Sequence, residues 1–198
     1  MPRQRRIIVY IATSADGYIA RPDGSVDWLN RPRTGRGVDS STGDYGMGAF
    51  FKSIDTILWG RKTYDLALKM GSGSGGFGPK VMNYVFTHRP PESSTKNVEF
   101  VSAPIRDFAR RLRAKPGKDI WMMGGAGIIA SFLDEGQIDE FIIHVIPTFI
   151  GEGIPLVQPR HRTVPLKLRS VRRFSDGVVR LHYAVMRQQG KPGRTRHE

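Results

Sequence analysis

The fold is decided by the stretch Ile120-Trp-Met-Met-Gly-Gly-Ala-Gly-Ile-Ile-Ala-Ser-Phe-Leu133. Its first four residues are apolar without polar alternation, which is typical of a strand buried on both faces. A glycine turn follows, and the apolar residues after it predict a helix over residues 127–135. The free backbone N–H groups at such a helix start favour an anion, and the glycines let that anion approach closely.

The glycine turn has two interpretations. Residues 125–130 match the dinucleotide-binding pattern Gly-x-Gly-x-x-Ala. A Rossmann domain also needs an acidic residue at the end of the next strand to bind a ribose, but that strand ends Val145-Ile146-Pro147. We therefore expect a phosphate site in another type of α/β domain. The second interpretation is a turn that serves only packing.

Further strands and helices alternate on both sides of this unit. Strands are predicted over residues 6–12, 55–59, 82–87, 98–101, 120–123, 140–146, 166–172 and 178–186, and helices over 44–53, 61–70 and 104–114. This alternation predicts an α/β fold: a three-layer sandwich with a mixed, mostly parallel sheet of about eight strands and a C-terminal antiparallel hairpin. We expect one domain over residues 1–187, loops over 31–43 and 71–78, and a basic, disordered tail over 188–198.

Composition removes several function classes. The chain has 198 residues and no Cys, which excludes disulfides, thiolate nucleophiles and Cys-ligated zinc, and no metal site is predicted. Neither a signal peptide nor a membrane span is visible, so the sequence predicts a cytoplasmic protein.

The net charge of +13 suggests, taken alone, a nucleic-acid partner. Nearly all of this excess lies in residues 1–6, 159–173 and 187–198, and the rest of the chain is close to neutral. We therefore interpret the basic stretches as solvated surface and expect no membrane or nucleic-acid partner. A basic nucleic-acid-binding protein is the competing function that this charge supports.

Two other predicted strands also end in groups suited to an anion. Gly60-Arg61-Lys62-Thr63-Tyr64 follows one strand and opens a helix, and Thr87-His88-Arg89 ends another. Cations in the first turn of a helix oppose its dipole, which is understandable if an anion lies among them. Three such strand ends predict an extended polyanion, as in a dinucleotide, over the carboxyl edge of the sheet.

These motifs resemble a known superfamily. Residues 60–64 followed by Gly124-Gly125-Ala126-Gly127 resemble the dihydrofolate reductase-like proteins. Residues 14–20 (Ser-Ala-Asp-Gly-Tyr-Ile-Ala) and 150–156 (Ile-Gly-Glu-Gly-Ile-Pro-Leu) are more similar to the riboflavin-biosynthesis reductase branch, the RibD C-terminal domain. The resemblance covers about residues 6–187 and implies an NADPH-dependent reductase on a mixed sheet, commonly a homodimer.

The resemblance, together with the charge pattern, also implies the site residues. Ala12, Ile19 and Glu152 are expected beside the nicotinamide. The residues expected to contact NADPH are Ala12, Ile19, Gly60, Arg61, Lys62, Thr63, Thr87, His88, Arg89, Gly124, Gly125, Ala126, Gly127, Ile128 and Glu152.

The resemblance also implies three catalytic candidates at the substrate side: Asp44, Asp16 and Trp28. Asp44 occupies the position of the carboxylate that holds the pterin in folate reductases, and its alternative role is to cap a helix. Asp16 has the alternative role of bracing its own turn. His144, inside a predicted strand, is interpreted as a buried core residue.

The functional hypothesis is hydride transfer from NADPH to a C=N or C=O bond of a small heterocycle. The expected substrate is similar to 5-amino-6-(5-phosphoribosylamino)uracil or to a pterin. The riboflavin deaminase activity is excluded because its zinc signature needs cysteines. Two further functions stay open: dihydrofolate reductase proper, and a protein that binds the cofactor without catalysis.

Overall fold

A computed structural model describes residues 3–30, 44–71, 80–91 and 96–186. The loop expected over 31–43, the glycine-rich stretch beyond Gly71 and the tail expected over 188–198 lie outside the described residues.

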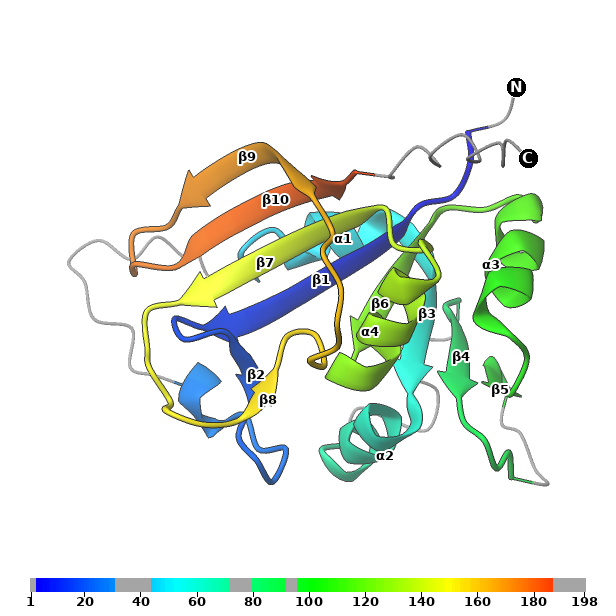
Figure 1. Cartoon of the computed structure of the whole chain (residues 1–198), viewed down its shortest axis with the longest axis horizontal. Coiled ribbons are helices and arrows are strands. Elements are labelled where there is room, and N and C mark those ends of the chain that lie inside the picture. Colours follow the sequence, from blue (N-terminus) through cyan, green and yellow to red (C-terminus); the bar gives the residue numbers. More distant parts are fainter. Residues whose placement is uncertain (1–2, 31–43, 72–79, 92–95, 187–198) are drawn as a thin grey trace, which may run out of the picture.

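Eight strands form one sheet in the order β5-β4-β3-β6-β1-β7-β10-β9 (Figure 1). Their bounds are β1 Ile7–Ser14, β3 Ile54–Gly60, β4 Met82–Phe86, β5 Val98–Val101, β6 Asp119–Gly124, β7 Glu140–Ile146, β9 Leu166–Arg173 and β10 Val179–Val185. All pairs from β5 to β7 are parallel, whereas β10 runs antiparallel to both β7 and β9. The predicted mixed, mostly parallel sheet with a terminal hairpin is confirmed.

Four helices cover the two faces of the sheet: α1 Met47–Lys52, α2 Arg61–Lys69, α3 Ile105–Ala114 and α4 Ala126–Asp134. Phe50 of α1 and Tyr64 of α2 pack with Ile8 on one face. Phe108 of α3 and Phe132 of α4 pack on the other face, with Ile7, Val9 and Ile120. Because neighbouring strand residues point to opposite faces, the continuous apolar run of β1 supplies both cores. This arrangement confirms the three layers.

Three short elements were not predicted. They are β2 Tyr18–Ala20 and β8 Ile154–Pro155, which pair as a small antiparallel sheet, and a 3₁₀ helix over Asp27–Leu29. Elements this short carry no readable periodicity. Their close packing explains one glycine, because a Cβ at Gly153 would lie 2.2 Å from the carbonyl oxygen of Ala20.

Several basic residues that we expected to be solvated form ion pairs instead. Arg6 pairs with Asp119 and Glu140 at the amino ends of three strands, and the side chain of Arg5 is 5% exposed beside Asp55. Arg160 and Arg162 both bind Asp134, and the hydrogen bond from Arg162 holds the pKa of that carboxyl below its usual range. These four arginines therefore help to attach residues 5–6 and 160–162 to the rest of the domain. Within the described ranges, no helix has the length and apolar character needed to cross a membrane.

Candidate functional site

Two helices begin side by side at the carboxyl edge of the sheet. Strands β3 and β6 are neighbours, and Trp59 is in register with Gly124. Helix α2 starts directly after Gly60, and α4 starts directly after Gly125. The capping residue of each helix is a glycine, Gly60 or Gly125, and provides no side-chain hydrogen bond to the helix start. Both helices therefore present uncapped N–H groups and the positive end of their dipoles at one edge.

The glycines at this edge let the two strand ends approach closely. A Cβ at Gly60 would lie 3.3 Å from Ile128 Cγ2 and 3.5 Å from the carbonyl oxygen of Gly124. A Cβ at Gly125 would lie 3.0 Å from Thr63 Oγ1. Gly124 has a φ of 111°, a value that side-chain-bearing residues rarely adopt, and its peptide bond to Gly125 is cis. The structure thus brings the predicted motifs 60–64 and 124–128 together.

Ile19 on β2 lies beside the glycine turn between β6 and α4, since its Cδ1 would lie 4.0 Å from a Cβ at Gly125. Ala126 is buried at the start of α4, and Gly127 faces the side chain of Gln158. Ala12 lies elsewhere, in a cluster with Trp28, Ile146 and Phe174. Of the three residues expected beside a nicotinamide, Ile19 therefore lies at the glycines and Ala12 lies on the α1 side of β1.

The third predicted strand end, that of β4, lies next to the end of β3, on the side away from β6. Gly60 is in register with Phe86, so Arg61 and Thr87 stand one residue beyond the ends of neighbouring strands. The Nε of Arg61 lies 2.8 Å from both carboxylate oxygens of Asp65, and its guanidinium lies 5.3 Å from the ring of Phe100.

The remaining cationic candidates are on the surface. Thr87 Oγ1 accepts a hydrogen bond of 3.2 Å from the backbone of Arg89. Lys62, His88 and Arg89 are exposed. The side chain of Arg61 is thus held by α2 and β5, while its three cationic neighbours have solvent around them.

Asp16 joins two loops. Its carboxylate accepts hydrogen bonds from the backbone N–H groups of Ile150, at 3.1 Å, and Gly151, at 2.8 Å. A hydrogen bond from Ser14 and these backbone donors lower the pKa of Asp16. This geometry supports the bracing interpretation and explains why residues 14–20 and 150–156 occur together. Glu152, in the braced loop, is exposed.

Asp44 holds the start of α1. Its carboxylate accepts hydrogen bonds from the N–H groups of Gly46, at 2.7 Å, and Gly48, at 3.1 Å, and these bonds lower the pKa of Asp44. The helix begins at Met47 rather than at Asp44. This geometry supports the capping role, and a role of Asp44 in substrate binding stays a prediction.

Trp28 is 5% exposed, and its indole Nε1 has no hydrogen-bond partner within the described ranges. An unpartnered buried donor is costly, so this N–H is a candidate to bind a ligand atom. The ring packs with Ile146, Phe174 and Val178. Trp28 therefore lies between β7 and the turn of the terminal hairpin.

Polar side chains lie under the start of α1. His144 is 4% exposed, as expected for a core histidine, and its Nε2 lies 3.2 Å from the carbonyl oxygen of Tyr45. Burial lowers the pKa of His144, and burial raises the pKa of Tyr10 to about 12. The Tyr10 hydroxyl therefore stays protonated and donates to the same carbonyl at 3.2 Å.

Sequence reasoning missed the contribution of the terminal hairpin to this region. Arg180 Nη1 would lie 3.1 Å from a Cβ at Gly46, and Arg172 lies 4.8 Å from the ring centroid of Phe174. Asp176, in the hairpin turn, accepts a hydrogen bond from the hydroxyl of Tyr45. No local sequence pattern in residues 166–186 indicates that hairpin side chains contact the start of α1, because strand pairing decides which of them reach it.

The comparisons with known proteins agree with the geometry. A family model described as the RibD C-terminal domain matches residues 5–180. The chain belongs to the RibD C-terminal domain family. Two relatives from Bacillus subtilis (strain 168) are uncharacterized proteins. YwjB is 37% identical over 180 residues, with 91% of this chain and 98% of the relative covered. YyaP is 34% identical over 197 residues, with 91% and 95% covered.

Solved structures of RibD-like proteins share the fold. A putative riboflavin biosynthesis protein from Shewanella sp. PV-4 superposes with a TM-score of 0.76 at 27% identity, over 92% of this chain and 99% of that one. A diaminohydroxyphosphoribosylaminopyrimidine deaminase/5-amino-6-(5-phosphoribosylamino)uracil reductase from Thermotoga maritima superposes with a TM-score of 0.67 at 16% identity, over 92% and 57%. The expected dihydrofolate reductase-like fold of this RibD C-terminal domain protein is confirmed.

Proposed function

We propose that this member of the RibD C-terminal domain family is an NADPH-dependent reductase. It transfers a hydride to a C=N or C=O bond of a small heterocyclic substrate, similar to 5-amino-6-(5-phosphoribosylamino)uracil or to a pterin. The observation that carries the proposal is the approach of two uncapped helix starts across Gly60 and Gly125, with Arg61 beside them. The solved neighbour from Thermotoga maritima, which is named in part as a 5-amino-6-(5-phosphoribosylamino)uracil reductase, supports the same reaction class.

The residues at the glycine turns fit a dinucleotide. The N–H groups at the starts of α2 and α4 suit a pyrophosphate, which the glycines let close to the backbone. Arg61, with Thr87, His88 and Arg89 near it, suits the additional 2′-phosphate that distinguishes NADPH from NADH. When bound, NADPH supplies the hydride. The protein orients the cofactor relative to the substrate and excludes water from the reacting atoms.

The substrate side is assigned to the α1 face of β1. Ala12 and Trp28 contribute apolar contact there, and the Nε1 of Trp28, which has no partner among the described residues, offers one donor. Asp16 positions the loop that carries Glu152 rather than touching substrate. Because Asp44 is occupied by backbone N–H groups, it fixes the start of α1 beside this surface.

The experiment compares two variants of α2 by titration with NADPH and NADH, followed by Trp fluorescence. Arg61→Ala is expected to weaken NADPH binding about tenfold or more, because it removes a charge-assisted contact to phosphate, and to change NADH binding little. Lys69→Ala is the matched control, because it removes a cation from the exposed end of the same helix. Absence of binding of either nucleotide to the unaltered protein contradicts the proposal.

Reductase activity needs its own assay, the substrate-dependent loss of NADPH absorbance. Dihydropterins, dihydrofolate and ribosylaminopyrimidines are the compounds to supply. If NADPH binds but none of them is reduced, cofactor binding stands and the proposed reaction fails. This outcome separates a reductase from a binding protein without catalysis.

A further inference from the structure

The side chain of Arg61 extends across the end of a neighbouring strand. Arg61 is the first residue of α2 and follows β3, whereas its guanidinium lies 5.3 Å from the ring centroid of Phe100 on β5. Strand β4 lies between β3 and β5 in the sheet. Phe86, the last residue of β4, is in register with Gly60. The guanidinium therefore reaches across β4, close to the point where the chain continues into Thr87.

Two contacts fix this orientation of Arg61. Its Nε donates to both carboxylate oxygens of Asp65, at 2.8 Å each, one helical turn further along α2. The guanidinium also lies over the ring of Phe100, which is a cation–π contact. The ring of Phe100 is in turn packed edge to face with the buried ring of Tyr64, at a centroid distance of 6.1 Å. One carboxylate and one supported aromatic ring thus determine where this guanidinium lies.

These contacts leave one edge of the guanidinium open. Among the described residues, no hydrogen bond is donated by Nη1 or Nη2 of Arg61, and 41% of its side chain is exposed. The two Nη groups form an edge of the planar guanidinium that matches two oxygens of a phosphate. The protein therefore holds Arg61 at Nε and leaves its Nη edge for a ligand.

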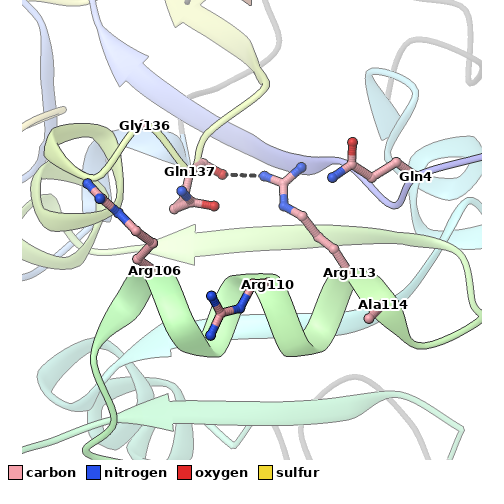
Figure 2. A pocket seen from close by; sticks show the side chains of 7 residues that line it. All are labelled: Gln4, Arg106, Arg110, Arg113, Ala114, Gly136 and Gln137. Carbon is pink, nitrogen blue, oxygen red and sulfur yellow. Dashed lines mark hydrogen bonds between the residues drawn. The ribbon is translucent and has the colours of Figure 1, made fainter.

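Two arginines of α3 are bound within the protein in a different way. Arg110 and Arg113 line an open cavity of about 550 Å³ (Figure 2). Arg110 pairs through Nη2 with Asp107, at 2.9 Å, and Arg113 pairs through Nη1 with Asp139, at 2.8 Å. Their Nη groups are therefore used by carboxylates of the protein, whereas those of Arg61 are not.

An acidic residue beside a phosphate site has two opposing effects. Its negative charge repels the phosphate, although solvent and salt screen this repulsion strongly. A contact that already orders a long arginine side chain also lowers the conformational entropy that binding must remove. The carboxylate of Asp65 is 43% exposed and is bonded at Nε rather than at the Nη groups of Arg61. We therefore expect the ordering effect to exceed the repulsion.

We propose that Asp65 and Phe100 are positioning residues that give the site its selectivity for NADPH over NADH. The inference rests on the proposed reductase function, in which Arg61 binds the 2′-phosphate of the nucleotide. Asp65 and Phe100 act through Arg61, because they hold its guanidinium with the Nη groups available to that phosphate. NADH has a hydroxyl in place of the phosphate and gains nothing from this arrangement. The selectivity thus depends on three residues of α2 and β5 rather than on Arg61 alone.

The test measures the dissociation constants of NADPH and NADH by calorimetry at constant ionic strength. Adenosine 2′,5′-bisphosphate and adenosine 5′-monophosphate serve as the matching fragments with and without the 2′-phosphate. Asp65→Ala and Phe100→Leu each remove one contact to Arg61. Asp65→Asn keeps an oxygen that accepts from Nε, and Phe100→Tyr keeps the ring.

Asp107→Ala is the matched control for Asp65→Ala. Asp107 also forms an exposed pair with an arginine of its own helix, and its side chain is 47% exposed. Its helix α3 packs on the face of the sheet opposite to α2. This substitution therefore removes an acid of the same kind without touching Arg61.

Asp65→Ala and Phe100→Leu are each expected to weaken the binding of NADPH and of the bisphosphate about threefold or more. The binding of NADH and of the monophosphate should change little, as should all binding by Asp107→Ala. Asp65→Asn and Phe100→Tyr should restore most of the affinity. In an Arg61→Ala background neither loss should occur, because both residues act through that guanidinium. Thermal unfolding of each variant checks that it folds.

Three results overturn the proposal. The first is unchanged or tighter NADPH binding by Asp65→Ala, which means that repulsion by the carboxylate equals or exceeds its ordering effect. The second is an equal loss for NADPH and NADH, which indicates general damage to the site. The third is a loss that persists in the Arg61→Ala background. The reductase proposal survives each of these results if the unaltered protein binds NADPH, whereas absence of that binding overturns both proposals.

Discussion

Gly125 and Thr63 meet across the ends of two neighbouring strands: a Cβ on Gly125 would stand 3.0 Å from the hydroxyl oxygen of Thr63. The two residues are far apart in sequence and belong to the starts of α4 and α2. Their closeness places the starts of the two helices side by side at the edge of the sheet. The site proposed for the dinucleotide phosphates is therefore one joint structure made from two separate motifs.

A side chain at position 125 is expected to impair nucleotide binding more than folding. The φ of Gly125 is −79°, which other residues adopt, so Gly125→Ala and Gly125→Val cause no backbone strain. The added atoms displace Thr63 and occupy the space over the N–H groups. NADPH affinity, measured by fluorescence titration, should fall progressively from Gly to Ala to Val, by about tenfold or more for Val. Equal affinities of all three proteins contradict this assignment of the turn.

Two arginines of the N-terminal segment should differ sharply in their effect on stability. Arg5 is 5% exposed and binds Asp55 and Thr56, whereas Arg3 is 67% exposed and pairs with Asp119. Arg5→Met leaves buried acceptors without their donor, so it should lower the free energy of unfolding by about 3 kcal/mol. Arg3→Met should lower it by less than about 1 kcal/mol. Urea unfolding measures both, and similar values for the two variants refute the predicted network.

His144 should make the folded state less stable in mild acid. Burial lowers its pKa in the folded protein below the unfolded value of 6.5, so the unfolded chain binds the proton first as the pH falls. The contribution of neutral His144 to the free energy of unfolding is therefore fully present above about pH 6.5. Below that pH the free energy of unfolding declines, with a slope of at most about 1.4 kcal/mol per pH unit, until the pKa of His144 in the folded protein is reached.

Urea unfolding at about pH 7.5 and about pH 5.5 measures this effect. His144→Gln should reduce the difference in unfolding free energy between the two pH values. His161→Gln is the control, because His161 is exposed. A pH dependence that is the same in His144→Gln and in the unaltered protein assigns the effect to other groups.

We expect a homodimer that forms through the outer hairpin. Leu166, Leu168 and Val171 on β9 are 44%, 51% and 55% exposed, on the face opposite Arg172. Among the described helices, α3 and α4 cover the other end of this face (Figure 1). Such an apolar surface matches a second copy of itself about a two-fold axis.

Leu168→Lys should convert the dimer to a monomer in light scattering, whereas Lys167→Gln, on the other face, should not. An unaltered protein that is monomeric at micromolar concentration refutes this expectation.

The strands and helices with long apolar patterns were predictable. The buried runs of β1, β6 and β7 and the amphipathic α3 agree with the sequence to within a few residues. The glycine turns that join β3 to α2 and β6 to α4 were predictable as well, because glycine and a helix start act locally. The elements β2 and β8 were not, since they are stabilised by their mutual pairing and by the Asp16 brace rather than by their own residues.

The sequence by itself determined the α/β class, the order of the main strands and helices, and the residue types at the strand ends, because burial and turn chemistry are encoded locally. Only the tertiary structure decided which of these residues meet. It directed the carboxylate of Asp44 to the backbone of α1, paired most N-terminal arginines with acids, and placed Arg172 opposite Arg180. Strand register, which depends on packing across the whole sheet, sets such contacts.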